Sequence, residues 1–266
     1  MSEPKVLLEK SPRDPRVGRL VLNRPEVRNA WDGETVTLLQ RAVRDLASDD
    51  SVRVVELSGE GPSFCAGADL EWMKSLSNFT MEENRRDSAE LAQLFKALDD
   101  LEKPVVARVQ GAALGGGTGL VAACDVVVAA EGAVFGTTEV RVGVIPAVIA
   151  PYVIRKIGES HARAWFLTGE RVGAEEARRV GLVHHVVPEK DLARATTAVI
   201  DAILLGGPLA VAEAKRLVRA VHTMPPRDAQ AWALQHMAER RGSHEGLEGL
   251  KAFLEKRPPA WTTKES

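Results

Sequence analysis

Hydrophobic and polar positions follow two different periods in the first part of the chain. The runs "KVLLEK" and "VGRLVLN" are rich in β-branched residues and predict two strands, separated by a proline-containing turn at 11–16. From Asp32 to Ala47 the spacing becomes that of a helix, and Asp32 is placed to cap its start. The apolar face of this helix consists of Val36, Leu39, Val43 and Leu46.

Three further apolar runs predict buried strands. "VVELSG", "VVARVQG" and "VVVAAEG" begin at Val54, Val105 and Val126, and each ends near a glycine that precedes a turn and helix-compatible sequence. Strands that are apolar at every position are typical of a parallel sheet covered on both faces. The uneven spacing of the runs excludes a tandem repeat array, so we expect a winding β-β-α architecture.

Helical spacing dominates the remainder of the chain. A long amphipathic helix is predicted over 82–101, with Leu91, Leu94, Phe95 and Leu98 on one face, and "LVHHVVP" predicts a last strand. The segments "PLAVAEAKRLVRAV", "AQAWALQHMAERRGS" and "EGLEGLKAFLEKRPPAW" then follow as helices. We therefore expect a core at 1–195 and, at 196–266, a helical region that packs on the core or on another subunit.

Composition restricts the partners that we expect. The chain of 266 residues has a net charge of −2, which provides no electrostatic basis for binding nucleic acid or an anionic membrane surface. No apolar run approaches the roughly 18 residues of a membrane span, and no secretory signal is visible. Cys65 and Cys124 lack disulfide or zinc spacing and are interpreted as reduced core residues. We expect a cytoplasmic protein that binds neither membrane nor nucleic acid.

Two glycine-containing turns are candidates for the functional site. "ALGGGTGLVAACD" places three glycines between a predicted strand and a predicted helix, where the first backbone N–H groups have no intrahelical partner. The pattern lacks the lysine of a phosphate-binding loop, and taken alone it also fits a helix that packs closely on a strand. "SFCAGADLEWM" forms a second such turn at Ala66 and Gly67. Two N–H donors that converge from separate turns would stabilise an oxyanion.

Five stretches together resemble the enoyl-CoA hydratase/isomerase (crotonase) superfamily. They occur in order along nearly the whole chain: "LNRPEVRNAWD", "GPSFCAGADL", "VQGAALGGGTGLVAACDVVVAAEGAVFGTTEVRVGVIP", "FLTGERVGAEEARRVGLVHHVVP" and "FLEKRPPAW". The resemblance implies an α/β fold with a crotonase-like ββα spiral core and a C-terminal helical trimerisation region. The expected assembly is a homotrimer or a dimer of trimers.

The same resemblance implies an acyl-CoA thioester as substrate. Its carbonyl is expected between the N–H groups of Ala66 and Gly116, with no metal and no cofactor, because CoA is part of the substrate. The residues implied in CoA binding are Arg28 at the phosphates, Ala30 along the pantetheine path, Ala66 at the thioester, and Ala68, Asp69 and Leu70 near the adenine. Lys256 and Arg257 are expected either to reach the nucleotide of a neighbouring subunit or to be ordinary surface charges.

Hydratases of this family typically carry two glutamates, and this chain retains one of the two positions. The first position falls on Gly119 and the second on Glu139. Glu139 is therefore the predicted general acid/base, with a surface or capping carboxylate as the alternative interpretation. A single glutamate fits both a hydratase and a Δ3,Δ2-enoyl-CoA isomerase.

The stretch "IPAVIAPYVIRKIG" refines the expected substrate. Together with "GGGTGL" and "CAGADLEWM", it resembles bacterial methylglutaconyl-CoA hydratase-like members, which implies hydration of 3-methylglutaconyl-CoA in leucine degradation. The free carboxylate of that substrate would need a cation, and the candidates are Arg85, Arg86, Arg141 and Arg155. Three other functions stay open: an isomerase, a non-catalytic acyl-CoA-binding or RNA-binding protein, and a dehydratase acting on an acyl carrier protein.

Overall fold

Six strands form the main sheet of the computed structural model, which describes residues 3–262. Their order is β1 (Val6–Lys10), β2 (Val17–Leu22), β3 (Val54–Gly59), β4 (Val105–Val109), β6 (Val126–Ala130) and β9 (His185–Val187). β1 and β2 pair antiparallel, and every later pairing is parallel. The three apolar runs are thus neighbouring parallel strands, as predicted.

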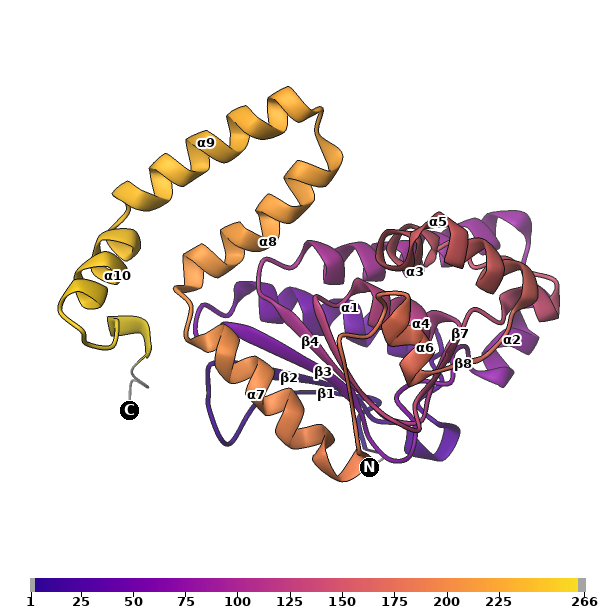
Figure 1. The fold of residues 1–266 in the computed structure, drawn as a ribbon. Helices are drawn as coiled ribbons and strands as arrows, with labels where there is room; N and C mark the ends of the chain where they lie inside the picture. Colours follow the sequence, from indigo (N-terminus) through magenta and orange to yellow (C-terminus); the bar gives the residue numbers. More distant parts are fainter. Residues whose placement is uncertain (1–2, 263–266) are drawn as a thin grey trace.

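A smaller sheet is formed by β5 (Ala112–Leu114), β7 (Val134–Gly136) and β8 (Val172–Gly173). β5 follows β4 and β7 follows β6, so the chain alternates between the two sheets as it winds (Figure 1). This confirms the β-β-α winding. The third run differs from the expectation, because β6 leads into β7 and the short 3₁₀ helix η2 (Glu139–Val142) rather than directly into an α-helix.

The main sheet is buried on both faces. Val55, Val105 and Val127 contribute to a large apolar cluster with α1 (Gly33–Ser48), α3 (Met81–Asp100), α4 (Gly116–Ala123) and α5 (Ala150–Thr168). The alternate residues Val54, Val106 and Val128 pack with α7 (Leu192–Leu204) on the opposite face. The continuous apolar runs therefore have a direct structural reason: helices cover both sides of the sheet.

The predicted helix starts are confirmed by their caps. Asp32 accepts a hydrogen bond from the Thr35 N–H at 2.9 Å at the start of α1. Thr80 and Glu83 form a reciprocal capping box at the start of α3. Leu94, Phe95 and Leu98 are buried on the predicted apolar face of that helix.

The expected boundary after residue 195 falls inside α7. Ile200 and Leu204, beyond that boundary, pack on the main sheet with Leu192, which precedes it. The chain therefore leaves the core only after Leu204. Within residues 3–262 no single helix is long and apolar enough to cross a membrane; the segments Glu189–Leu204 and Pro208–Thr223 pass that test only as a pair, bent by 102°.

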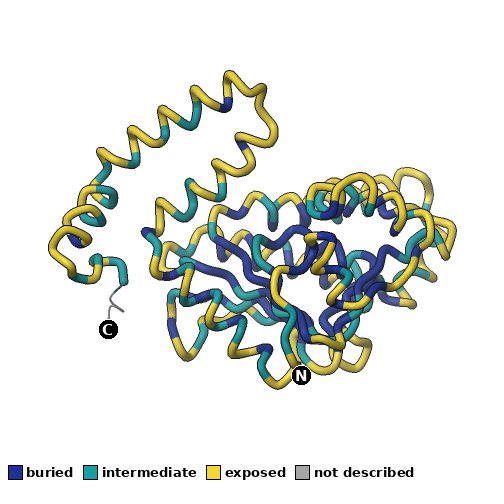
Figure 2. The backbone as a smooth tube through the Cα atoms, in the orientation of Figure 1, coloured by how far each residue is buried: buried dark blue, intermediate teal, exposed yellow. Residues whose placement is uncertain are grey.

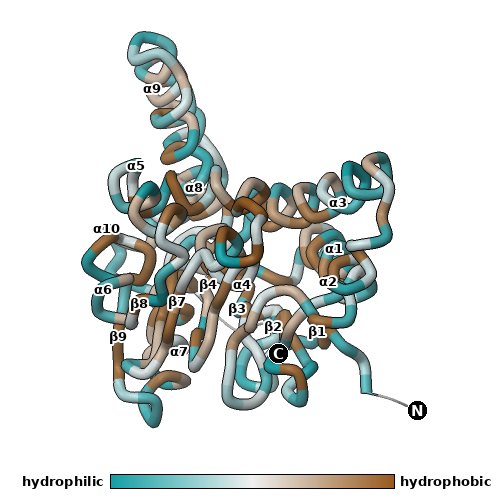
Figure 3. The backbone as a smooth tube through the Cα atoms, turned by 90° about the vertical axis from the view of Figure 1, so that its right-hand side faces the viewer, coloured by the Kyte–Doolittle hydropathy of each residue, from teal (hydrophilic) through white to brown (hydrophobic). Residues whose placement is uncertain are grey.

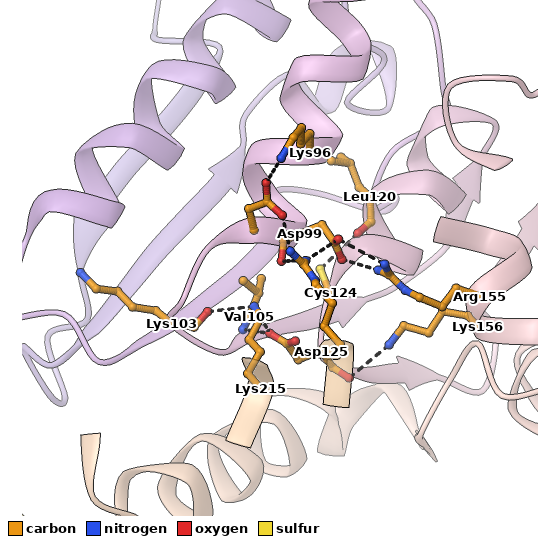
Figure 4. A network of polar contacts seen from close by, with 12 residues as sticks. Lys96, Asp99, Lys103, Val105, Leu120, Cys124, Asp125, Arg155, Lys156 and Lys215 are labelled. Carbon is orange, nitrogen blue, oxygen red and sulfur yellow. Dashed lines mark hydrogen bonds and ion pairs between the residues drawn. The ribbon is translucent and has the colours of Figure 1, made fainter. Parts of the chain in front are cut away.

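The last three helices form an arm that extends from the core: α8 (Pro208–Thr223), α9 (Pro226–Gly242) and α10 (His244–Leu254). Most of α9 and α10 is exposed, and α9 stands clear of the sheets and their helices (Figures 2 and 3). α8 is tied to the core by Lys215, whose Nζ lies 2.7 Å from Asp125 Oδ2 (Figure 4). A cavity of about 570 Å³ lies beside these groups, under α8.

Candidate active site

Each of the three consecutive glycines at the start of α4 is required for a separate reason. Gly115 has a φ of 53°, which favours glycine. A Cβ at Gly116 would lie 1.9 Å from Cζ2 of Trp31, and a Cβ at Gly117 would lie 2.5 Å from the carbonyl oxygen of Cys65. Close packing is therefore a primary reason for these glycines, and it brings the first N–H groups of α4 next to the loop that contains Cys65.

The two turns singled out in the sequence meet as predicted. Cys65 donates its N–H to the Ala112 carbonyl at 2.8 Å and accepts from the Leu114 N–H at 3.0 Å. The two segments run parallel with Cys65 opposite Ala113, which brings the loop that follows Cys65 next to the start of α4. The Cys65 thiol is buried, which raises its pKa to about 12; the side chain packs and is not an activated nucleophile.

The structure corrects the donor expected in the first turn. The N–H of Ala66 donates to the Arg28 carbonyl at 2.9 Å and is therefore engaged. The residues on either side of Ala68 are both hydrogen-bonded to Trp31. The Trp31 N–H donates to the Gly67 carbonyl, and the Asp69 N–H donates to the Trp31 carbonyl. The N–H of Ala68 itself therefore points away from Trp31. Neither Ala68 nor Gly116 donates its N–H to an acceptor within residues 3–262. The pair of free donors is thus Ala68 and Gly116.

Glu139 lies beside these donors, at the first residue of η2. Its Oε1 is 3.3 Å from the position that a Cβ on Gly115 would occupy. Its Oε2 is buried and has no hydrogen-bond partner within residues 3–262. Burial raises the pKa of this carboxyl above the ordinary glutamate value. A buried carboxyl that has one oxygen without a partner and a raised pKa, next to free N–H donors, is suited to proton transfer.

Apolar and aromatic side chains line α4 on this side. Trp31 meets Phe95 edge to face, with ring centroids 5.8 Å apart, and Phe95 lies 5.8 Å from Tyr152. Gly119 faces Phe95 and Ile149. Sequence analysis placed Phe95 only on a core face and did not single out Trp31 or Ile149, because no local pattern indicates which apolar residues meet a helix from elsewhere in the chain.

Asp69 supports the loop and is not free to meet an adenine. It accepts from the N–H groups of Glu71 and Trp72, which caps α2 (Leu70–Leu76), and it pairs with Arg24 Nη2 at 2.9 Å. Burial acts to raise its pKa, but these donors and the Arg24 charge outweigh burial, and the pKa is lowered. Arg24 also donates to the carbonyl of Ala30, which is buried.

Two of the other residues expected to contact CoA are accessible. Arg28 is exposed, and its guanidinium has no hydrogen-bond or ion-pair partner within the described residues. Leu70 is 74% exposed at the start of α2. The Arg28 carbonyl accepts the Ala66 N–H, and Leu70 begins α2 two residues after Ala68, so both residues adjoin the Ala68 loop.

Lys256 and Arg257 are not brought to this site within one protomer. They follow α10, on the opposite side of the molecule from α2 (Figure 1). Arg257 is also engaged, with Nη1 2.7 Å from Glu248 Oε1 and Nε 2.7 Å from Glu255 Oε2.

The structure also separates the four arginines considered for a substrate carboxylate. Arg155 pairs with Asp99 near the start of β6, in the polar network under α8 (Figure 4). Arg141 lies two residues after Glu139, but its Nε points to the Thr168 carbonyl. Arg85 and Arg86 are exposed on α3, where Arg85 lies 3.7 Å from Glu82.

Comparison with known proteins places this geometry in a family. Residues 14–264 match the family model described as enoyl-CoA hydratase/isomerase. The 2,3-dehydroadipyl-CoA hydratase of Escherichia coli is 34% identical over 250 residues, which cover 93% of this chain and 95% of the relative. The crystal structure of an enoyl-CoA hydratase from Mycobacterium smegmatis superposes with a TM-score of 0.92 at 36% identity, covering 98% of this chain and all of that one. The AtuE protein of Pseudomonas aeruginosa gives 0.93 at 35% identity, with the same coverage.

Proposed function

Because the chain belongs to the enoyl-CoA hydratase/isomerase family, we propose that it catalyses the reversible addition of water across the 2,3-double bond of an acyl-CoA thioester. One observation carries the proposal: the free N–H groups of Ala68 and Gly116 lie on two adjoining segments, next to the buried carboxyl of Glu139, whose Oε2 has no partner within residues 3–262. That combination provides both functions that the reaction needs, an anion site for the thioester oxygen and a proton carrier.

Ala68 and Gly116 would hold the thioester oxygen. When water adds at C3, negative charge moves through the conjugated system onto that oxygen, and two fixed N–H donors stabilise it. Gly116 also begins α4, whose dipole favours negative charge at this end. Loss of one such donor in an acyl-transfer site typically lowers kcat about 10²- to 10³-fold.

Glu139 would move the proton. As the water oxygen bonds to C3, its proton passes to the ionised Glu139, and the same carboxyl returns a proton to C2 as the enolate collapses. Because one carboxyl serves both carbons, both additions occur on the same face of the double bond. Its raised pKa makes the protonated form more accessible near neutral pH than for an ordinary glutamate.

An isomerase is the second candidate, and Gly119 is the observation that favours it. With glycine at this position, α4 provides no carboxylate to help to position a water. In that reaction Glu139 would remove a proton from C2 of a 3-enoyl-CoA and return it to C4, while the same two N–H groups stabilise the dienolate that forms. This reaction moves a proton between two carbons and requires no bound water.

We further propose 3-methylglutaconyl-CoA as a substrate of the hydratase. Of the arginines considered for its free carboxylate, Arg155 is paired with Asp99, and the exposed Arg85, Arg86 and Arg141 remain the candidates. An alanine at each position should raise KM for this substrate and leave KM for crotonyl-CoA unchanged.

The test compares the purified protein with its Glu139→Gln variant. Each receives crotonyl-CoA, a 3-enoyl-CoA and 3-methylglutaconyl-CoA, and mass spectrometry follows the products. Addition of one water, reduced about 10²- to 10⁴-fold in the variant, is expected. A shifted double bond at unchanged mass would identify an isomerase. Tight CoA-ester binding without product would indicate a non-catalytic binding protein.

We also propose that the arm assembles the protein into a homotrimer or a dimer of trimers. Large apolar side chains of the arm are exposed, among them Val218, Leu234, Leu250, Phe253 and Leu254. A surface of this kind is typical of a contact between chains, and in such an assembly Lys256 could reach a neighbour's nucleotide.

A further inference from the structure

We infer that Ile149 restricts the site to one carboxylate, because its side chain fills the space that a side chain at position 119 would need. The inference rests on the proposed function, in which Glu139 is the acid/base. It adds a reason why Glu139 acts alone: the packing of α5 against α4, and not only the glycine at position 119, excludes a second carboxylate.

The space beside Gly119 is occupied. A Cβ at this position would lie 2.2 Å from Cγ2 and 2.8 Å from Cβ of Ile149, and 2.9 Å from Cε1 of Phe95. Side chains essentially never approach so closely, so any residue other than glycine requires Ile149 or Phe95 to move. Both side chains are buried, at 3% and 1% exposure, and cannot simply swing into solvent.

Backbone conformation does not explain the glycine at position 119. Its φ is not positive, unlike that of Gly115. Its N–H donates to the Gly115 carbonyl at 3.1 Å as an ordinary helical residue. Glycine in a helix interior is destabilising relative to alanine. Space, rather than conformation, is therefore the requirement that glycine meets here.

A side chain at position 119 would lie on the Glu139 side of α4. A Cβ in a helix points towards the helix N-terminus, and for Gly119 that direction leads to the turn that begins at Gly115, whose carbonyl accepts the Gly119 N–H. Glu139 Oε1 lies 3.3 Å from the position of a Cβ on Gly115. A carboxylate at 119 would thus extend towards Glu139, and Ile149 with Phe95 fills the region where it would begin.

Ile149 can be removed without disturbing the start of its own helix. It is the N-cap residue of α5, and its side chain makes no capping hydrogen bond. Glycine is accepted at N-cap positions. Ile149→Gly removes both Cγ2 and Cβ, the two atoms that lie closest to position 119, whereas Ile149→Ala would leave the Cβ in place.

A double-mutant cycle in thermal stability tests the packing. Gly119→Ala should lower Tm by about 5 °C when Ile149 is present, and its effect should largely disappear in the Ile149→Gly background. Gly132→Ala is the matched control, because no atom lies within 4 Å of a Cβ there. If Gly119→Ala is as harmless as Gly132→Ala, the inference is overturned, and this comparison does not require Ile149→Gly to fold.

Activity tests the chemical consequence. Gly119→Glu alone should not yield a second functional carboxylate. Combined with Ile149→Gly, it should restore hydration of crotonyl-CoA at least about tenfold relative to Ile149→Gly alone. In the Gly119→Glu/Ile149→Gly protein, the loss of hydratase activity caused by Glu139→Gln should also be at least tenfold smaller than in the parent chain. Altered stability alone would not produce this difference.

The two arms separate the possible failures. Coupling in Tm with an inactive parent protein would reject the proposed function and keep the packing. An active parent in which Gly119→Glu works equally well with Ile149 present would reject the role of Ile149 and keep the function.

Discussion

Glu139 is held at the site as a buried carboxyl with one oxygen that lacks a partner within residues 3–262. Burial makes its ionised form costly and raises its pKa, so the group needed for chemistry opposes folding when it is charged. Stability due to this carboxyl is fully present below its ordinary pKa of 4.5. It is lost as pH rises through the higher pKa of the folded state.

Glu139→Gln should therefore stabilise the protein at neutral pH while it removes activity. We expect Tm at pH 7 to rise by a few degrees, and the gain to vanish below about pH 4.5, where the carboxyl is protonated in both states. Differential scanning calorimetry across pH checks this, with the exposed Glu131→Gln as control. A stability gain that is the same at pH 4 and pH 7 would contradict the assignment of the raised pKa.

At the scale of elements, the start of α2 fixes the oxyanion loop. Ala68 immediately precedes Asp69, which caps α2 and pairs with Arg24. The direction of the Ala68 N–H therefore depends on this cap and on the neighbouring bonds of Trp31.

Asp69→Ala should lower both stability and kcat. Loss of the cap costs about 1 kcal/mol, and kcat should fall at least about tenfold because the donor is no longer fixed. Thr80→Ala, which removes the exposed cap of α3, is the control and should reduce stability without a comparable effect on kcat. Equal kcat values for the two variants would show that Asp69 does not position the donor.

At the scale of the whole molecule, the arm is tied to the core at both of its ends. Trp261, which follows α10, accepts hydrogen bonds through its carbonyl from Arg16 and Arg53. Lys215 and Arg219 of α8 pair with Asp125 and Asp99 of the core, whereas α9 and α10 present exposed apolar side chains. This arrangement leaves α10 available for a second copy of the chain.

Lysine at Leu250 and Phe253, which are 58% and 79% exposed on α10, should dissociate the assembly. Light scattering should then report the monomer mass, with the circular dichroism of the core unchanged. Leu167→Lys, at an 80% exposed position of α5, should leave the mass of the parent protein unaltered. A variant that keeps the parent mass would exclude α10 as the contact.

The sequence alone determined the elements and the candidate chemistry. Apolar runs predicted β3, β4 and β6, helical spacing predicted α1 with its Asp32 cap and α3, and two glycine-containing turns predicted where free N–H groups would meet. These features are local, since periodicity and turn composition are properties of adjacent residues. Family resemblance then added the expected role of Glu139 and the importance of Gly119.

Only the tertiary structure decided which groups are free and which are engaged. The sequence does not distinguish Ala66 from Ala68 as an N–H donor. In the structure the Ala66 N–H donates to the Arg28 carbonyl, whereas the Ala68 N–H has no acceptor within residues 3–262. Asp69 caps α2. The core extends to Leu204 rather than ending near residue 195, because α7 packs on the sheet. The meeting of Ile149 with Gly119 joins α5 to α4. Such contacts depend on how distant segments approach one another, which no local pattern encodes.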